Sequence, residues 1–237
     1  TLIGNAGNDL IEGGNGADIM DGGVGTDTLS YTSSDAAVTV NLTTGAATGG
    51  HAEGDSFSNF ENITGSANDD VLTGDAAANV LSGASGNDVL AGLAGADTLN
   101  GGAGTDTADY SASSAAVSVD LLTSTFSGGD AAGDTLVSIE NLIGSAQGDT
   151  LTGDGNENVI TAGDGNDTVF GNSGNDTLRG ETGNDVLNGG LGADILDGGA
   201  GIDTIDYTTS TQGVSISLTT GIALGGEATG DTLISIE

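Results

Sequence analysis

Aspartate recurs at a fixed spacing in this chain of 237 residues, and carboxylates at regular intervals can bind metal ions. Fifteen nonapeptides approach the pattern G-G-x-G-x-D-x-U-x, where U is apolar, and the sixth position is Asp in thirteen of them. These aspartates are Asp9, Asp18, Asp27, Asp70, Asp88, Asp97, Asp106, Asp149, Asp167, Asp176, Asp185, Asp194 and Asp203. The other two copies carry Asn79 and Asn158.

Glycine is frequent at positions 1, 2 and 4 of the nonapeptide. Glycine adopts positive φ angles that other residues reach only at a cost, so we expect these residues to turn carbonyl oxygens toward a common centre. The sequence therefore predicts ligands from both side chain and backbone. The glycines predicted at positions 2 and 4 of such sites are Gly14, Gly16, Gly23, Gly25, Gly102, Gly104, Gly163, Gly165, Gly190, Gly192, Gly199 and Gly201.

Positions 7 and 8 predict the element that carries each turn. Position 7 is Val, Ile or Thr in fourteen of fifteen copies, and position 8 is always apolar. A β-branched residue beside an aliphatic one, bounded by glycine, is typical of a very short strand. Since side chains alternate along a strand, we expect position 8 to point inward and positions 7 and 9 to point outward.

The repeat lengths predict how the strands stack. Runs of three, five and seven nonapeptides occupy residues 4–30, 65–109 and 144–206, and each run is longer than the one before it by two nonapeptides. Two nonapeptides therefore form one coil. We predict an all-β fold, a right-handed parallel β-roll, in which residues 1–237 form a single continuous roll and each coil contacts its neighbours.

The predicted stacking brings the aspartates into two files. Turns on one side lie about 4.8 Å apart, where unit charges repel by roughly 3 to 4 kcal/mol at an effective dielectric near 20. A hard cation between successive turns replaces this repulsion with coordination, and oxygen ligands in a flexible loop suit Ca²⁺ better than Mg²⁺. Pairing each copy with the second one after it gives about nine or more calcium ions. We expect a disordered chain without calcium and a β-rich fold with it.

These nonapeptides resemble the RTX (repeats-in-toxin) haemolysin-type calcium-binding repeats. The clearest copies occupy residues 13–21, 101–109, 189–197 and 198–206, and the resemblance spans all fifteen nonapeptides. It implies a parallel β-roll with Ca²⁺ in both rows of turns, type I secretion, and folding after exit into calcium-rich surroundings. Two copies depart from the family pattern: they carry Asp75 and Asp154 at position 2 instead of Asp at position 6, so calcium binding there stays open.

Three longer units interrupt the runs at residues 31–64, 110–143 and 207–237. Each starts with Tyr, continues with an alternating strand, and then has a turn-like segment with Asp55, Asp134 or Asp231 where position 6 would lie. These three aspartates are either further metal ligands or solvated turns. The acidic residues that follow, Glu61, Glu140 and Glu237, are expected to be solvated strand ends, and similar interruptions occur in RTX proteins as longer loops.

Composition excludes several functions. The formal net charge is −34, with a single Arg or Lys, so contact with nucleic acid or insertion into an anionic membrane is not expected. The chain has no Cys and therefore no disulfide or thiolate metal site. Its only histidine, His51, is expected to be a surface residue, and no nucleophile motif precedes a helix. Position 3 is too variable for a flat ice-binding face. We expect no enzyme.

Two contexts remain open for this secreted or cell-surface module. One is a stiff spacer or filament element of an adhesin or surface layer, and the other is the secretion and folding domain of an exported protease or lipase. Residues 1–3 match the three residues that complete the earlier long units, so Glu237 of one copy would continue in register into Thr1 of the next. This favours the structural context and predicts end-to-end self-association into an array or filament.

Overall fold

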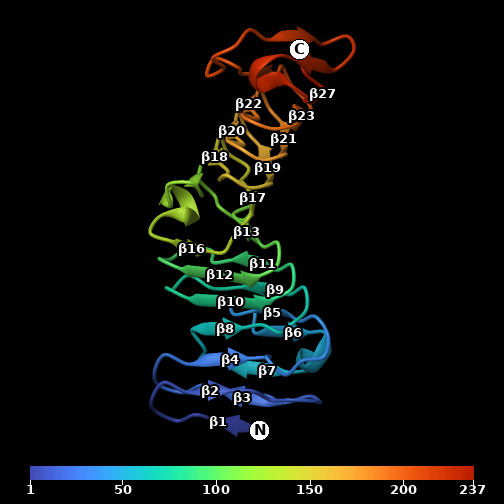
Figure 1. The fold of residues 1–237 in the computed structure, drawn as a ribbon. Coiled ribbons are helices and arrows are strands. Elements are labelled where there is room, and N and C mark those ends of the chain that lie inside the picture. The colour runs from blue at the N-terminus through green and yellow to red at the C-terminus, as the bar shows by residue number, and fades with distance from the viewer. The chain divides into compact units, whose positions relative to one another are not determined.

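The computed structural model describes all residues, 1–237, and contacts divide them into two compact units. Unit 1 contains Thr1–Asp109 and Ala132–Ile139, and unit 2 contains Tyr110–Ala131 and Glu140–Glu237. Both are built of short strands, and the three helical elements are single 3₁₀ turns, η1 (Gly50–Ala52), η2 (Gly129–Ala131) and η3 (Gly226–Ala228) (Figure 1). The single continuous roll stays a prediction.

The strands of unit 1 form two sheets, ordered β1-β3-β7-β6-β5-β9-β11-β13 and β16-β12-β10-β8-β4-β2. Their bounds are β1 (Leu2–Ile3), β2 (Leu10–Ile11), β3 (Ile19–Asp21), β4 (Thr28–Ser30), β5 (Thr39–Asn41), β6 (Ala46–Thr48), β7 (Ser56–Ser58), β8 (Asn62–Thr64), β9 (Val71–Thr73), β10 (Val80–Ser85), β11 (Val89–Ala91), β12 (Thr98–Ala103), β13 (Thr107–Asp109) and β16 (Thr135–Val137).

Unit 2 repeats this arrangement, with sheets ordered β17-β19-β21-β23-β27-β26-β25 and β15-β14-β18-β20-β22-β24. Their bounds are β14 (Ser118–Asp120), β15 (Thr125–Ser127), β17 (Asn141–Ile143), β18 (Thr150–Thr152), β19 (Val159–Asp164), β20 (Thr168–Phe170), β21 (Thr177–Thr182), β22 (Val186–Asn188), β23 (Ile195–Asp197), β24 (Thr204–Ile205), β25 (Ser215–Ser217), β26 (Ile222–Leu224) and β27 (Thr232–Ile234).

Strand pairing confirms the predicted β-roll. Within the runs the pairs are parallel and the partners lie two nonapeptides apart, as in Leu81 with Leu99 and Ile160 with Leu178. Successive strands therefore alternate between two sheets, and two nonapeptides make one coil. An insertion of two nonapeptides keeps every turn on its original side.

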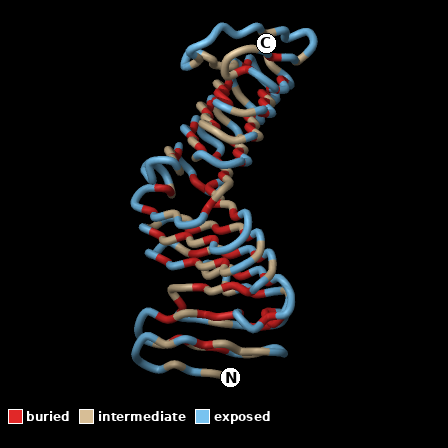
Figure 2. The backbone as a smooth tube through the Cα atoms, in the orientation of Figure 1, coloured by how far each residue is buried: buried red, intermediate tan, exposed pale blue.

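The core is a column of position-8 side chains inside each unit. Leu72, Leu90, Leu151 and Leu178 are fully buried, whereas the position-7 residue Val71 is 40% exposed. Figure 2 shows buried residues recurring from coil to coil in each unit. The predicted inward direction of position 8 is confirmed, because position 7 lies on the opposite face of the same strand.

The long units widen the roll with a small antiparallel excursion. In the first of them β5 pairs antiparallel with β6 and parallel with β9, which brings Val40 opposite Leu72. Tyr31, at the start of this unit, is fully buried. The predicted alternating strand is therefore present, and its inward residues join the column formed by the nonapeptides.

Candidate metal centre

The aspartates of position 6 form files along the turn edges. In unit 2 the backbone N–H of Asp167 donates to Asp185 Oδ1 at 2.8 Å, and the N–H of Asp185 donates to Asp203 Oδ1 at 2.9 Å. The other row repeats the pattern, with the Asp176 N–H donating to Asp194 Oδ1 at 2.8 Å. One oxygen of each carboxylate therefore ties its turn to the turn one coil before it.

The second oxygen of many of these carboxylates is buried and has no hydrogen-bond partner. Asp185 is 1% exposed, yet its Oδ2 accepts nothing. The same holds for the Oδ2 atoms of Asp9, Asp27, Asp88, Asp167, Asp176, Asp194 and Asp203. A buried charged oxygen without a partner is strongly unfavourable, so these atoms indicate a site for a cation.

Burial and charge together perturb these groups in the metal-free protein. Burial, together with the nearby carboxylates of Asp185 and Asp149, raises the pKa of Asp167 to about 7, although the hydrogen bond with the Asp149 backbone lowers it. Burial likewise raises the pKa values of Asp88, Asp176 and Asp194 to about 6. Without a cation, the folded roll favours protonated carboxylates.

Carbonyl oxygens converge on the same places as the free carboxylate oxygens. A Cβ built on Gly180 would overlap Asp185 Oδ2 of its own turn and would lie 2.6 Å from the Gly198 carbonyl oxygen of the next coil. Gly171 has the same surroundings, with Asp176 Oδ2 and the Gly189 carbonyl oxygen. The position-1 glycine thus leaves an oxygen-lined space that a side chain would fill.

This role of position 1 differs from the prediction. Positive φ was expected at positions 1, 2 and 4, but no position-1 glycine has it, and the expectation was wrong there. It is correct at positions 2 and 4 of the best copies, as in Gly102 (φ 103°) and Gly104 (φ 153°), with Gly201 as an exception. Non-glycine residues adopt left-handed angles at position 2 of five other turns, namely Asn5, Ala84, Leu93, Asn172 and Glu181.

The long units continue the files. Asp55 Oδ1 accepts the N–H of Asp18 at 2.8 Å, and Asp134 and Asp231 occupy equivalent places after Asp97 and Asp194. All three are at most 7% exposed, so they are not solvated turns. Whether they bind metal stays a prediction.

Sequence reasoning missed the glutamates. Glu61 Oε2 accepts the Asp27 N–H at 2.7 Å, and Glu237 Oε2 accepts the Asp203 N–H at 3.0 Å, as an aspartate of the file would. The expectation of a solvated strand end was wrong for Glu61, which is half-buried, whereas Glu237 is exposed. The signal was present, because Glu61 precedes Asn79 by the length of two nonapeptides, which is one coil.

The residues present fit a calcium ion. The carboxylate oxygens without partners are hard anionic ligands, and the carbonyl oxygens beside them are the neutral ligands that Ca²⁺ accepts in flexible loops. No group of three or more His, Cys, Asp or Glu side chains gathers at one point. A site here must therefore combine carboxylates from successive turns with backbone carbonyls, which excludes a zinc-type centre.

Family comparison supports this interpretation. The RTX calcium-binding nonapeptide repeat matches more than half of the chain, over residues 1–29, 57–90, 82–111, 139–169 and 170–205. The chain belongs to the RTX calcium-binding repeat family. RTX repeats bind Ca²⁺, so this RTX chain is a calcium-binding repeat module. No curated protein matches it.

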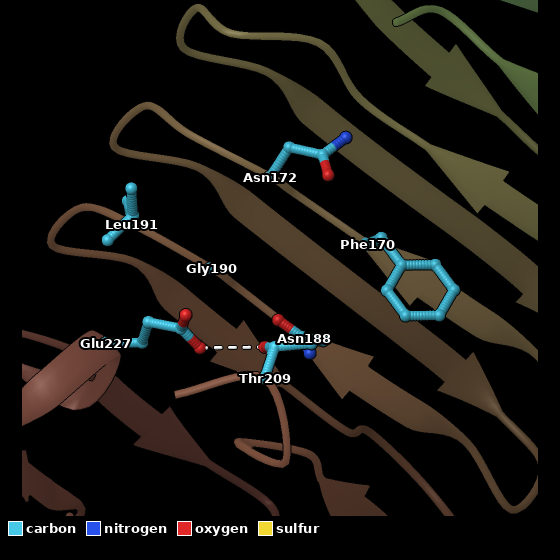
Figure 3. Close-up of a pocket in the computed structure, with 7 residues that line it drawn as sticks. All are labelled: Phe170, Asn172, Asn188, Gly190, Leu191, Thr209 and Glu227. Atoms are coloured by element: carbon cyan, nitrogen blue, oxygen red, sulfur yellow. Dashed lines mark hydrogen bonds between the residues drawn. The ribbon is translucent and has the colours of Figure 1, made fainter. Parts of the chain in front are cut away.

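A surface cavity of about 230 Å³ lies in unit 2 of this RTX chain (Figure 3). Thr209 Oγ1 donates to Glu227 Oε2 at 2.8 Å at its edge. The cavity contains no histidine or cysteine, and its one carboxylate is held by a threonine rather than by a reactive group. It is lined by Phe170, Asn172, Asn188, Gly190, Leu191, Thr209 and Glu227.

The only histidine is buried, so its expected surface position was wrong. His51 is 8% exposed, and its Nδ1 lies 3.3 Å from Ser33 Oγ. Its Nε2 lies 4.0 Å from the exposed carboxylate of Asp35. Glu12 accepts the Ser33 N–H at 2.8 Å, and this hydrogen bond holds the first long unit against the preceding coil.

Proposed function

We propose that this protein is an extracellular structural module whose roll folds when calcium binds between successive turns. The buried carboxylate oxygens without hydrogen-bond partners carry this proposal. A chain with a net charge of −34 collects such carboxylates in two files only if cations neutralise them. Calcium supplies that charge and links each turn to the next coil.

The proposed ligands are the thirteen position-6 aspartates and the carbonyl oxygens presented by the glycines of positions 2 and 4. The turns that contain a free Oδ2 are the strongest part of this set. Asp70 and Asp149 differ, because their Oδ2 atoms accept the N–H groups of Ser66 and Ser145.

A role outside the cell follows from the type of site. Sites built from flexible loops and few charges per ion, as in extracellular modules, bind calcium with dissociation constants of about 10⁻⁴ to 10⁻³ M. Such sites fill at extracellular calcium concentrations, so the chain would be exported unfolded and would fold on arrival. No helix is long and apolar enough to cross a membrane. We propose a mechanical role, as a stiff spacer, and no catalytic one.

Calcium titration tests the proposal. Far-ultraviolet circular dichroism of the purified chain should show much less β structure in chelator than in millimolar Ca²⁺. Mg²⁺ at the same concentration is the control, and it should give little of the change because it gives up its water ligands reluctantly. Identical spectra in chelator and in Ca²⁺ would refute calcium-dependent folding.

End-to-end self-association is a separate part of the proposal. Strands at the ends of a β-roll present unpaired N–H and C=O groups, which can pair with another roll. Sedimentation velocity in saturating calcium should show species larger than a monomer that disappear in chelator. A strict monomer at high concentration contradicts self-association and leaves calcium-dependent folding untouched.

A further inference from the structure

The carboxylate oxygens without partners are confined to parts of the nonapeptide runs. None lies between residues 28 and 87, 107 and 166, or 204 and 237. Each of these segments contains a long unit, and the first two also contain the two nonapeptides that follow it. Their position-6 groups are nevertheless buried, as Asp55 and Asp70 are. Protein donors must therefore satisfy these groups.

The tyrosine that begins each long unit is one such donor. Tyr31 Oη donates to Asp55 Oδ2 at 3.1 Å, and Tyr207 Oη donates to Asp231 Oδ2 at 2.6 Å. Burial and the nearby Asp55 carboxylate raise the pKa of Tyr31, which keeps its hydroxyl protonated. The tyrosine hydroxyl thus binds Oδ2, the carboxylate oxygen that has no partner in turns such as that of Asp185.

The first turn after a long unit uses its own serine. The Ser66 N–H donates to Asp70 Oδ2, and Ser66 Oγ donates to Asp70 Oδ1 at 3.0 Å. Ser145 and Asp149 repeat both bonds in unit 2. Position 2 has no positive φ in these turns, unlike Gly23 or Gly102, so the backbone N–H is free to point at the carboxylate.

The second turn replaces the carboxylate with an amide. The Asp75 N–H donates to Asn79 Oδ1 at 2.8 Å, and Asn79 Nδ2 donates to the Glu61 carbonyl oxygen at 2.8 Å. Asn158 makes the same two bonds with Asp154 and Glu140. The amide nitrogen thus binds the carbonyl oxygen that a cation would otherwise bind.

We propose that these segments are calcium-independent locks, in which tyrosine, serine and asparagine donors take the place of the metal. The locks are residues 31–79 in unit 1, and residues 144–158 and the Tyr207–Asp231 pair in unit 2. Calcium then occupies only the turns outside the locks, so Asp70 and Asp149 leave the set of proposed ligands. The inference rests on the proposed function, because it divides the turns into those that need calcium and those that do not.

The locks have a consequence for folding. A chain without calcium keeps the register of residues 31–79, since Asp70 Oδ1 still accepts the Val38 N–H at 2.7 Å across the long unit. Each block of calcium-binding turns then grows from a neighbouring coil that is already formed. Calcium binding would be cooperative within a block and independent between blocks.

Hydrogen–deuterium exchange of the full chain tests the proposal. In chelator, the amides of Val38, Ser66 and Ser145 should exchange about tenfold or more slowly than in the unfolded chain. The amides of Asp167 and Asp185 should exchange at the unfolded rate until calcium is added. Loss of protection throughout the chain in chelator overturns the locks but leaves calcium-dependent folding intact. Full protection throughout overturns both.

A tyrosine variant tests the donor directly. Tyr31→Phe leaves Asp55 Oδ2 without its donor, so the protection of residues 31–79 in chelator should fall by about tenfold and return with calcium. Tyr207→Phe is the matched control, because it makes the same change in unit 2 and should leave residues 31–79 unchanged. Should Tyr31→Phe fail to fold, Ser66→Ala removes one hydroxyl donor in the same lock and should lower the protection of that segment in chelator. Unchanged protection in a folded Tyr31→Phe or Ser66→Ala protein contradicts the proposal.

Discussion

Replacing Asp185 with Asn should change the stability of unit 2 in opposite directions with and without calcium. Asp185 lies in the middle of a file, where its Oδ1 accepts the Asp167 N–H and its own N–H donates to Asp203. Its Oδ2 has no partner. The Asn variant keeps the shape and the Oδ1 bond, and it exchanges the free anionic oxygen for an amide donor.

The two effects can be estimated separately. In calcium, Asp185 would serve the sites on both sides of its turn, and a tenfold weaker affinity at each lowers the free energy of unfolding by about 3 kcal/mol. In chelator the variant loses repulsion from two neighbours about 4.8 Å away. Each such pair is worth up to roughly 3.5 kcal/mol at a dielectric near 20. Partial protonation of Asp185 reduces this repulsion, because burial raises the pKa of its carboxyl group. A gain of about 1 to 3 kcal/mol is expected.

Urea unfolding in both buffers measures the change of sign. The chelator series is run in trimethylamine N-oxide, which favours buried states and populates the metal-free fold. Asp164→Asn is the matched control, since Asp164 is exposed in the same unit and the variant removes the same charge. If Asp185→Asn behaves like Asp164→Asn in both buffers, the file does not bind calcium through Asp185 and the reasoning is wrong.

Three further predictions concern the turn, the core and pH. Gly192→Ala should abolish calcium-dependent folding, because its Cβ would overlap the Gly174 carbonyl oxygen at φ 154°, whereas Gly155→Ala meets nothing within 4 Å and should fold normally by circular dichroism. Leu178→Ala should cost about 2 to 5 kcal/mol in calcium-loaded unfolding, while Thr177→Ala on the outer face should cost less than about 0.5 kcal/mol. In chelator, acid should favour the fold, because the folded pKa of Asp167 is raised to about 7 from about 3.9 in the unfolded chain. The loss of stability caused by burying the ionised Asp167 carboxylate is complete above pH 7 and disappears as pH falls toward 4. Circular dichroism should therefore show more β structure at pH 5 than at pH 7.5 without calcium, and a higher calcium midpoint at the lower pH.

The sequence predicted the parts of the fold that depend on periodicity. A spacing of two nonapeptides and an apolar position 8 are sufficient to place Leu151 against the next coil, because only one register buries every such residue. The same spacing places the aspartates in files. These features repeat many times, so single departures do not obscure them.

The long units were harder because their key contacts occur once in each unit. Nothing in the spacing of Tyr31 and Asp55 shows that the hydroxyl meets the carboxylate, since the intervening hairpin sets their distance. His51 was misplaced for the same reason, because its contact with Ser33 depends on the path of the long unit and Glu12, which binds Ser33, comes from the preceding coil. Contacts of this kind require the path of the chain.

Calcium and local donors solve the same physical problem in different parts of this chain. Each coil buries one carboxylate or amide oxygen per turn, and the backbone N–H one coil earlier can satisfy only one of the two carboxylate oxygens. In the runs the remaining oxygen faces carbonyl oxygens, so only a cation can join them. Around the long units a tyrosine hydroxyl, a serine N–H or an asparagine amide donates a hydrogen bond in place of the cation. The distribution of donors along the sequence therefore sets where the roll depends on calcium, and the aspartate count alone overestimates that dependence.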